Sequence, residues 1–215
     1  MKKILISVYL FLDDLFKVKH KPSKDQLVKL SGKEIFIGKY TYGFESTQIF
    51  SWGEEIDIKI GRFCSIGAGL KLFSGGNHPT WFISSYPFGL VYNDFLKIPK
   101  NKSIVFSNGE ITIGNDVWVG RDVTIMSGLT LGDGSVIAAN SHVVKDVEPY
   151  SIYGGNPARF IRYRFSKEII EKLLEIQWWN YEDHIIEKIH HILLNKPDNN
   201  TFVEIAKILN ENNSK

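Results

Sequence analysis

Residues 113–143 read IGNDVW VGRDVT IMSGLT LGDGSV IAANSH V, so an aliphatic residue returns at every sixth position. These residues are Ile113, Val119, Ile125, Leu131, Ile137 and Val143, and a small or aliphatic residue stands four places after each: Val117, Val123, Leu129, Ser135, Ser141 and Val147. A period of six belongs neither to an α-helix nor to a single alternating strand. It predicts short strands joined by turns, which bury their apolar side chains only when neighbouring repeats stack on them. The sequence therefore predicts a β-helix.

Small residues follow most of these aliphatic positions. They are Gly114, Gly120, Gly132 and Ala138, whereas Met126 and Val144 depart from the pattern. A glycine suits a tight corner where a larger side chain would collide with the next coil. The same phrase occurs earlier, over residues 60–71, with a possible first copy at Ile37-Gly38.

The hexad register is lost between about Phe73 and Glu110. Aromatic residues, prolines and one histidine fill this stretch: His78, Pro79, Trp81, Tyr86, Pro87, Phe88, Tyr92, Phe95 and Pro99. It is too aromatic for a disordered linker and too irregular for another coil, so we predict an ordered loop, about 73–110, extruded from the β-helix. Loops held by a rigid scaffold often carry binding and catalytic residues.

After Pro157 the apolar spacing becomes helical. Three stripes share this spacing: Ile169, Leu173 and Ile176; Ile185, Ile189, Ile192 and Leu193; Phe202, Ile205, Ile208 and Leu209. We expect these helices to cap the open end of the β-helix, with Trp178 and Trp179 as packing anchors. The predicted organisation is an N-terminal segment (1–34), the β-helix domain (35–163) and a C-terminal helical extension (164–215).

Composition and charge exclude several classes of function. The 215 residues carry 26 Lys and Arg against 24 Asp and Glu, a formal net charge of +2, which is no nucleic-acid signature although Arg159, Arg162 and Arg164 cluster. The single cysteine, Cys64, excludes an intramolecular disulfide and a multi-cysteine zinc site. Because it occupies an inward hexad position, we expect it to be a buried hydrophobic residue.

The N-terminus imitates the start of a signal peptide. Lys2 and Lys3 precede the apolar run 4–12, but Asp13 and Asp14 follow at once without a small-residue cleavage site. The run is also too short to span a bilayer. We expect an amphipathic segment that packs on the protein, no stable membrane insertion and a cytoplasmic location.

Several ordered motifs resemble the hexapeptide-repeat xenobiotic acetyltransferases. They are the hexad array, Gly76-Asn77-His78, Ser85-Tyr86-Pro87-Phe88, the run 113–120, the block 154–158 and Trp178-Trp179-Asn180. This family includes type B chloramphenicol acetyltransferases, streptogramin acetyltransferases and related sugar acetyltransferases. The resemblance covers roughly residues 35–190 and implies a left-handed parallel β-helix, a homotrimer and acetyl transfer from acetyl-CoA.

A histidine in the extruded loop is the candidate catalytic base. Attack on a thioester by a hydroxyl or amine needs a base near neutral pH, and histidine titrates closest to that range. Of six histidines only His78 lies in the loop, since His20 precedes the repeats, His142 lies in a coil, and the others lie on the terminal helices: His184, His190 and His191. The family phrase around His78 implies that it is the general base.

The residues after this histidine depart from the family. Members commonly read His-Arg-x-Asp-Trp, whereas this chain has Pro79, Trp81 and Phe82 at the Arg, Asp and Trp positions. This departure argues against assuming an antibiotic acceptor. Trp81 could stack on a sugar or a nucleotide base, or pack the loop. We favour a carbohydrate acceptor, either a nucleotide-linked amino sugar or a glycan precursor, over chloramphenicol or a streptogramin.

The resemblance also implies where acetyl-CoA binds, in a groove between coils of adjacent subunits. The pantetheine would lie near Gly120, Ala138 and Ala139, and the phosphates near Lys145 and Arg162, with Arg159 less certain. The residues expected to line the acceptor site are Asn77, Trp81, Tyr86 and Trp118. Trp118 has the alternative role of packing between subunits.

Two other classes of protein share the β-helix. A γ-type carbonic anhydrase would bind zinc through three histidines, but the repeat region offers only His78 and His142, so we expect no metal requirement. A non-catalytic assembly or binding module would not need the His78 loop together with the residues that match CoA-binding positions. The expected partners are a small-molecule acceptor and further copies of the chain, and no nucleic acid.

Overall fold

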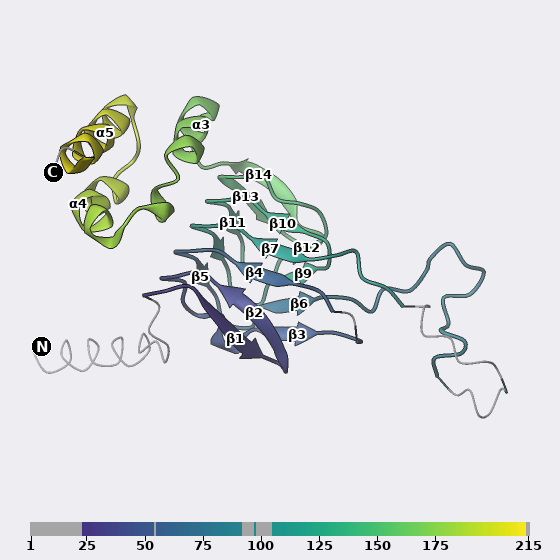
Figure 1. Ribbon diagram of the computed structural model, residues 1–215. Helices are drawn as coiled ribbons and strands as arrows, with labels where there is room; N and C mark the ends of the chain where they lie inside the picture. Colours follow the sequence, from purple (N-terminus) through teal and green to yellow (C-terminus); the bar gives the residue numbers. More distant parts are fainter. Residues whose placement is uncertain (1–22, 54, 92–96, 98–104, 214–215) are drawn as a thin grey trace, which may run out of the picture.

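The computed structural model describes residues 23–53, 55–91, 97 and 105–213. The apolar run 4–12 and His20 lie outside these residues, as do three members of the predicted loop: Tyr92, Phe95 and Pro99. Within them the chain forms a coil of short strands with helices beside it (Figure 1). The expectation of a packed N-terminal segment therefore stays a prediction.

The strands form three sheets, which we call A, B and C. Sheet A has the order β1 (Gln26–Leu30), β2 (Lys33–Ile37), β4 (Ile58–Ile60), β7 (Ile111–Ile113), β10 (Thr130–Leu131). Sheet B has the order β14 (Arg159–Tyr163), β13 (Ser151–Gly154), β11 (Val136–Ile137), β8 (Trp118–Val119), β5 (Ser65–Ile66). Sheet C has the order β12 (His142–Val143), β9 (Thr124–Met126), β6 (Lys71–Phe73), β3 (Gln48–Phe50). The chain visits A, B and C in turn, and a 3-10 turn, η1 (Phe44–Ser46), precedes β3.

The strand register explains the hexads. Parallel pairing places Leu131 beside Ile113, Ile137 beside Val119 and Val143 beside Ile125, so three hexads complete one coil. The six aliphatic side chains are at most 1% exposed and stack in columns inside the coil. Their burial supplies the main hydrophobic core, and the hexad prediction is confirmed.

The predicted loop interrupts the chain but not the coil. Ile60 pairs with Ile113 in sheet A, Ile66 with Val119 in sheet B, and Leu72 with Ile125 in sheet C. The register across the loop is therefore the same as between uninterrupted coils.

Three corners join the sheets, and each corner is named after the two sheets that its turns connect. The AB corner contains the turns 38–41, 61–64, 114–117, 132–135 and 148–150. The BC corner contains 67–70, 120–123 and 138–141, and the CA corner contains 127–129, 144–146 and the origin of the long loop.

The glycine corners are as tight as predicted. A Cβ on Gly61 would lie 2.4 Å from the carbonyl oxygen of Gly114, and one on Gly120 would lie 2.5 Å from the backbone nitrogen of Ala139. Both neighbours are backbone atoms of the next coil, which no rotamer change can move aside. The expected collision is confirmed at these positions.

Antiparallel strands cover one edge of sheet A and one edge of sheet B. β1 pairs with β2, and β14 pairs with β13 with an irregularity at Ile152 and Tyr153. Such strands shield the parallel coils from further strand addition. β1 falls within the range assigned to the N-terminal segment, and the sequence did not predict it.

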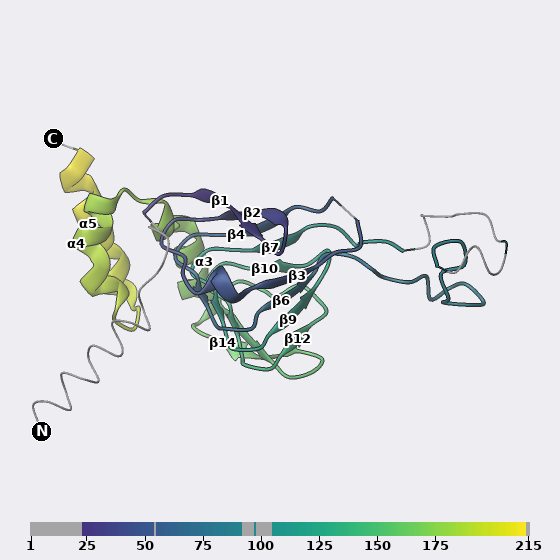
Figure 2. The ribbon, with the colours of Figure 1, turned by 90° about the horizontal axis from the view of Figure 1, so that it is seen from below.

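The helical stripes form α3 (Lys167–Ile176), α4 (Asp183–Leu193) and α5 (Asn199–Asn213), with a 3-10 turn, η2 (Trp178–Asn180), before α4. They do not cap the open end as expected but lie along the AB corner (Figures 1 and 2). Trp178 meets Phe63 with ring centroids 4.8 Å apart, and Trp179, only 1% exposed, packs in the cluster that contains Tyr150. Trp179 is thus confirmed as a packing anchor.

The reason for this docking lies in the corner turns. One residue in each AB turn adopts a left-handed conformation, with φ from 52° to 67°: Tyr40, Phe63, Asp116, Gly134 and Tyr150. Three of these residues carry aromatic rings, and the Phe63 and Tyr150 rings give the helices an apolar surface to cover.

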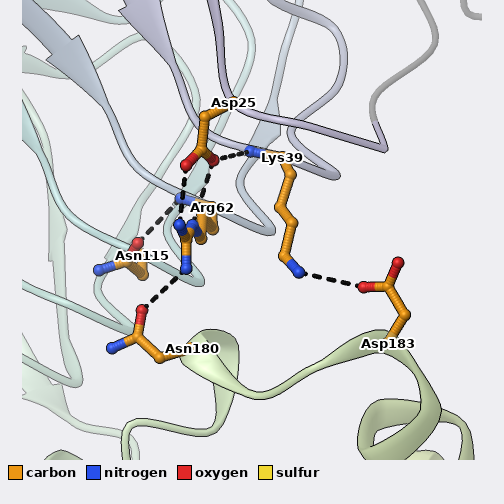
Figure 3. Close-up of polar contacts among 6 residues, drawn as sticks. All are labelled: Asp25, Lys39, Arg62, Asn115, Asn180 and Asp183. Atoms are coloured by element: carbon orange, nitrogen blue, oxygen red, sulfur yellow. Dashed lines mark hydrogen bonds and ion pairs between the residues drawn. The ribbon is translucent and has the colours of Figure 1, made fainter.

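A polar cluster joins three parts of the chain at this corner (Figure 3). Arg62 donates to both oxygens of Asp25, at 3.1 and 2.7 Å, and to Asn180 in η2 at 3.1 Å. Lys39 donates through its amide to Asp25 at 2.8 Å and through Nζ to Asp183 at 3.0 Å. The hydrogen bonds from Arg62 hold the pKa of the Asp25 carboxyl below its ordinary value. The residues before β1, the coil and the helices are therefore linked.

No helix in the described part of the chain combines the length and apolar character that crossing a bilayer requires.

Candidate functional site

The long loop leaves the coil after β6 and returns before β7, and it projects away from the helices (Figure 2). Its two stems form a small antiparallel bridge, in which the Asn77 amide donates to the Phe106 carbonyl at 2.9 Å and the Phe106 amide donates back at 3.0 Å. The Asn77 side chain and the Asn108 amide both donate to the hydroxyl of Ser127, at 3.2 and 3.1 Å. The base of the loop is thus tied to the coil.

His78 is the first residue beyond this bridge, and its side chain is exposed. Its Nδ1 lies 2.6 Å from the carbonyl oxygen of Ser85. A carbonyl only accepts hydrogen bonds, so Nδ1 must carry the proton and donate it. In the neutral ring Nε2 then has a free lone pair and can accept a proton.

The arm that carries His78 is aromatic and has few ionisable side chains. Residues 74–91 contain no Asp, Glu, Lys or Arg. Trp81 is 70% exposed and contacts Phe82 and Phe106, with ring centroids 6.0 and 5.5 Å apart. Tyr86 is 38% exposed and lies against Phe88. The two predicted acceptor residues on this arm, Trp81 and Tyr86, therefore present much of their surface to solvent.

The outer face of sheet B brings two of the predicted residues into one groove. Strand pairing aligns Trp118 with Val136, Ile152 and Arg162 in a row across four strands. The groove has a volume of about 410 Å³. Its other lining residues come from the AB corner, from β5 and from the segment after β14: Phe63, Asp116, Val117, Ser65, Arg164 and Phe165. Trp118 is 57% exposed at one end, and Arg162 lies exposed at the other.

The remaining residues proposed for acetyl-CoA lie on two corners. Gly120, Ala138 and Ala139 belong to the BC corner, where Gly120 is buried and Ala139 exposed. Lys145 follows β12 on the CA corner and is exposed. Lys145 and the loop that carries His78 thus lie after the carboxyl ends of the sheet C strands, while the small residues lie before their amino ends. A single chain does not gather the whole predicted set around one cavity.

An ion pair beside the groove was not predicted from the sequence. Arg164 donates to Asp116 at 3.3 Å and to the carbonyl of Gly134 at 2.6 Å, and its guanidinium lies over the Tyr150 ring at 5.3 Å. Burial raises the pKa of Asp116 to about 6, and the nearby positive charge of Arg164 only partly opposes this shift. Asp116 lies at a hexad position where no recurring apolar or small residue is expected, and Arg164 lies outside the repeats, so periodicity gave no signal for the pair.

Cys64 is fully buried, as expected, and desolvation raises the pKa of its thiol to about 12. A thiol of this kind carries almost no thiolate at neutral pH and is a poor nucleophile. In the part of the chain that the structure describes, no three His, Cys, Asp or Glu side chains are grouped closely enough to bind a metal ion.

The comparisons with known proteins agree on one family. The family model described as "Bacterial transferase hexapeptide (six repeats)" matches residues 110–145. The chain is 51% identical over 123 residues to a "Probable macrolide acetyltransferase" of Lysinibacillus sphaericus, an alignment that covers 57% of this chain and 68% of the relative.

Two longer alignments extend the match. A "Chloramphenicol acetyltransferase" of Agrobacterium fabrum is 38% identical over 71% of this chain and 78% of its own length. A "Virginiamycin A acetyltransferase" of Staphylococcus aureus is 42% identical over 77% of this chain and 80% of its own length. The hexads, the parallel coil and these relatives together show that the chain belongs to the hexapeptide-repeat acetyltransferases of the chloramphenicol and virginiamycin acetyltransferase type and is an acyltransferase.

Proposed function

We propose that the protein transfers the acetyl group of acetyl-CoA directly to a hydroxyl or amine of a carbohydrate acceptor, with His78 as general base. The contact between His78 Nδ1 and the Ser85 carbonyl carries this proposal, because it fixes the tautomer that leaves Nε2 unprotonated. The carbonyl would also stabilise the imidazolium that forms during the reaction, since it accepts a hydrogen bond from a more acidic donor.

In this mechanism His78 moves one proton in two steps. Nε2 takes the proton of the acceptor as its oxygen or nitrogen forms a bond to the thioester carbon. When the carbon–sulfur bond of the tetrahedral intermediate breaks, His78 returns the proton to the sulfur. The products are the acetylated acceptor and free CoA, and the imidazole regains its starting form.

The proposed cofactor site needs a second subunit. Gly120, Ala138 and Ala139 provide small side chains that let pantetheine approach the backbone, while Lys145 and Arg162 provide charge for the phosphates. We propose a left-handed coil and a homotrimer, in which a groove between subunits is completed by residues from both. The placement of His78 and the small residues beyond opposite ends of the sheet C strands supports such a shared site.

The loop favours a neutral surface on the acceptor. Trp81 presents a ring that could stack on the apolar face of a sugar, and residues 74–91 offer no charged partner for a phosphate. In a nucleotide-linked sugar the sugar would lie against this arm, and the diphosphate would have to bind elsewhere.

A second candidate function is acetylation of an antibiotic hydroxyl. The names of the three relatives favour it, because they specify macrolide, chloramphenicol and virginiamycin acetyltransferases. In the loop, Pro79, Trp81 and Phe82 stand where the family commonly has Arg, Asp and Trp, and this difference favours a different acceptor pocket.

An acceptor screen with detection of free thiol decides between the two candidates. Acetyl-CoA would be supplied with UDP-, dTDP- and GDP-linked amino sugars, neutral oligosaccharides, chloramphenicol, a streptogramin and a macrolide. We expect thiol release from acetyl-CoA to be fastest with a sugar acceptor. Thiol release by the His78→Ala variant gives the background hydrolysis that does not depend on the base. Fastest turnover of an antibiotic would replace the carbohydrate proposal, and equal turnover by His78→Ala would remove His78 from the mechanism.

A further inference from the structure

One buried hydroxyl holds both stems of the long loop. Ser127 follows β9 at the CA corner and is 1% exposed. Its Oγ accepts a hydrogen bond from Asn77 Nδ2 on the outgoing stem and one from the Asn108 amide on the returning stem, at 3.2 and 3.1 Å. Asn77 and Asn108 are 31 residues apart along the chain, and both donate to this single atom.

The returning stem also lies against the backbone next to Ser127. The Gly128 amide donates to the Gly109 carbonyl at 3.0 Å, and a Cβ on Gly128 would lie 2.6 Å from the Asn108 carbonyl oxygen. No side chain other than hydrogen fits there, and the φ of 74° at Gly128 suits glycine. The stem is thus seated on the coil and cannot shift without losing these contacts.

The outgoing stem is fixed in a similar way on the preceding coils. Ser74 donates its amide and its hydroxyl to the Phe50 carbonyl, at 2.9 and 3.1 Å. Three residues later Asn77 reaches Ser127. His78 therefore extends from a point that is fixed to two coils, while Ser85 holds its ring from the far side.

We infer that Ser127 is a positioning residue for acetyl transfer, acting through Asn77 on the imidazole of His78. This inference rests on the proposed role of His78. It also assigns the Asn77 side chain to the clamp that Ser127 forms, rather than to direct contact with the acceptor. Effective proton transfer requires the base within hydrogen-bond reach, so a displacement of about 1 Å can cost about 10²-fold in rate.

The first test is a double-mutant cycle with Ser127→Ala, Asn77→Ala and the double variant. Each single variant should lower kcat about 10- to 100-fold and leave the KM for acetyl-CoA within about twofold. Because the two side chains act as one unit, the double variant should be little worse than either single variant. If the fold-loss of kcat in the double variant equalled the product of the two single losses, the clamp would be overturned.

A second readout needs no acceptor. In the native protein the nitrogen-15 shifts of His78, identified by its loss in His78→Gln, should report the Nδ1-protonated tautomer. Ser127→Ala should turn this signal into a mixture of tautomers, because the imidazole no longer meets Ser85 in one position. An unchanged tautomer together with native kcat would show that Ser127 has no positioning role.

Ser151→Ala is the matched control. Ser151 is equally buried and donates one hydrogen bond, to Glu148, but it lies near the AB corner, away from the loop. This variant should lose thermal stability while keeping native kcat and the native His78 tautomer. If His78→Ala itself retains turnover, the proposed role of His78 as general base fails. If that variant is inactive while Ser127→Ala is native, the positioning role alone fails.

Discussion

The imidazole of His78 contacts the backbone carbonyl of Ser85, and the residue is exposed to solvent. A carboxylate partner would place a full negative charge beside the ring and attract a proton strongly. The Ser85 carbonyl orients the ring without such a charge, and because it is a backbone atom a side-chain mutation does not remove it. The contact therefore orients the imidazole, and His78 remains exposed to solvent. The rate should depend on this one side chain much more than on the aromatic residues around it.

Replacement of His78 tests this dependence. His78→Ala should lower kcat about 10²- to 10⁴-fold, the usual share of general-base catalysis. The Kd for acetyl-CoA should stay within about twofold, because the residues that we propose bind it lie on the coil. Steady-state kinetics and calorimetry would measure the two quantities. Turnover close to native, in a variant that assembles normally, would make His78 a structural residue.

Arg162 stands exposed at the end of the sheet B groove, where it could meet a phosphate. Arg162→Ala should raise the KM for acetyl-CoA about tenfold but that for a truncated acetyl thioester without the nucleotide by less than about twofold. Lys59→Ala, on sheet A with a partner in Glu110, should change neither value. Equal increases for both donors would place Arg162 outside the phosphate site.

Asp116 should give the fold an unusual pH dependence. Because burial raises its pKa to about 6, the native state binds this proton more tightly than the unfolded state does. The group therefore stabilises the fold most at low pH, and this stability is lost as the pH rises through about 6. The melting temperature of Asp116→Asn, relative to the parent, should be higher at pH 7.5 than at pH 4.5.

A carboxylate with the opposite shift provides the control. Asp25 has a lowered pKa and stays ionised at both pH values, so Asp25→Asn should be destabilised by nearly the same amount at each. Melting curves at fixed protein concentration would compare the variants. A relative melting temperature of Asp116→Asn that falls as the pH rises would contradict the raised pKa.

At the scale of elements, Arg62 links β1, the coil and the terminal helices. Arg62→Ala should lower the stability by about 1–2 kcal/mol, because a half-buried bidentate pair and a further hydrogen bond are lost together. Arg62→Lys should recover only part, since an ammonium cannot form the same fork. Denaturant melts would measure both.

A surface pair serves as the reference for this prediction. Lys167 contacts Glu171 at 3.8 Å and is 91% exposed, so Lys167→Ala should change the stability by less than about 0.5 kcal/mol. If Arg62→Ala were as mild, the cluster at the AB corner would not hold the elements together.

The elements differ in how well the sequence predicts them. Hexads specify the strands because every sixth side chain enters the core, as Val119 and Ile137 do. β1 escapes detection because none of its five residues is fully buried. The helices follow from their apolar stripes, but their docking depends on Phe63 and Tyr150, which lie far apart in sequence and meet only once the coil forms.

The candidate site is predictable to a similar degree. His78 could be found because a motif surrounds it, whereas the carbonyl of Ser85 is a backbone atom that any residue supplies. Ser127 is one of several serines in the coil, and only the folded stems reveal its two donors. Sequence thus identifies the candidate base but not the atoms that orient it.

At the scale of the whole molecule, the protein should be a homotrimer. Trp118 is 57% exposed in the row on sheet B, and the predicted site is divided between the two ends of the sheet C strands; both features favour a neighbouring chain. Light scattering at micromolar concentration should give three times the chain mass. A monomer mass would contradict the shared site, and Trp118→Asp would test whether this ring packs between subunits.

The unbroken register beneath the long loop makes the coil independent of what the loop contains. Coils on either side of it pair as if nothing had been inserted, and the ends of the insertion meet at Asn77 and Phe106. A change of length between these two residues costs little chain entropy, since the cost of closing a loop grows only with the logarithm of its length. If the loop carries the acceptor contacts that we propose, its length and sequence can vary, and the acceptor with them, while the coil that we propose binds acetyl-CoA keeps its strand pairing.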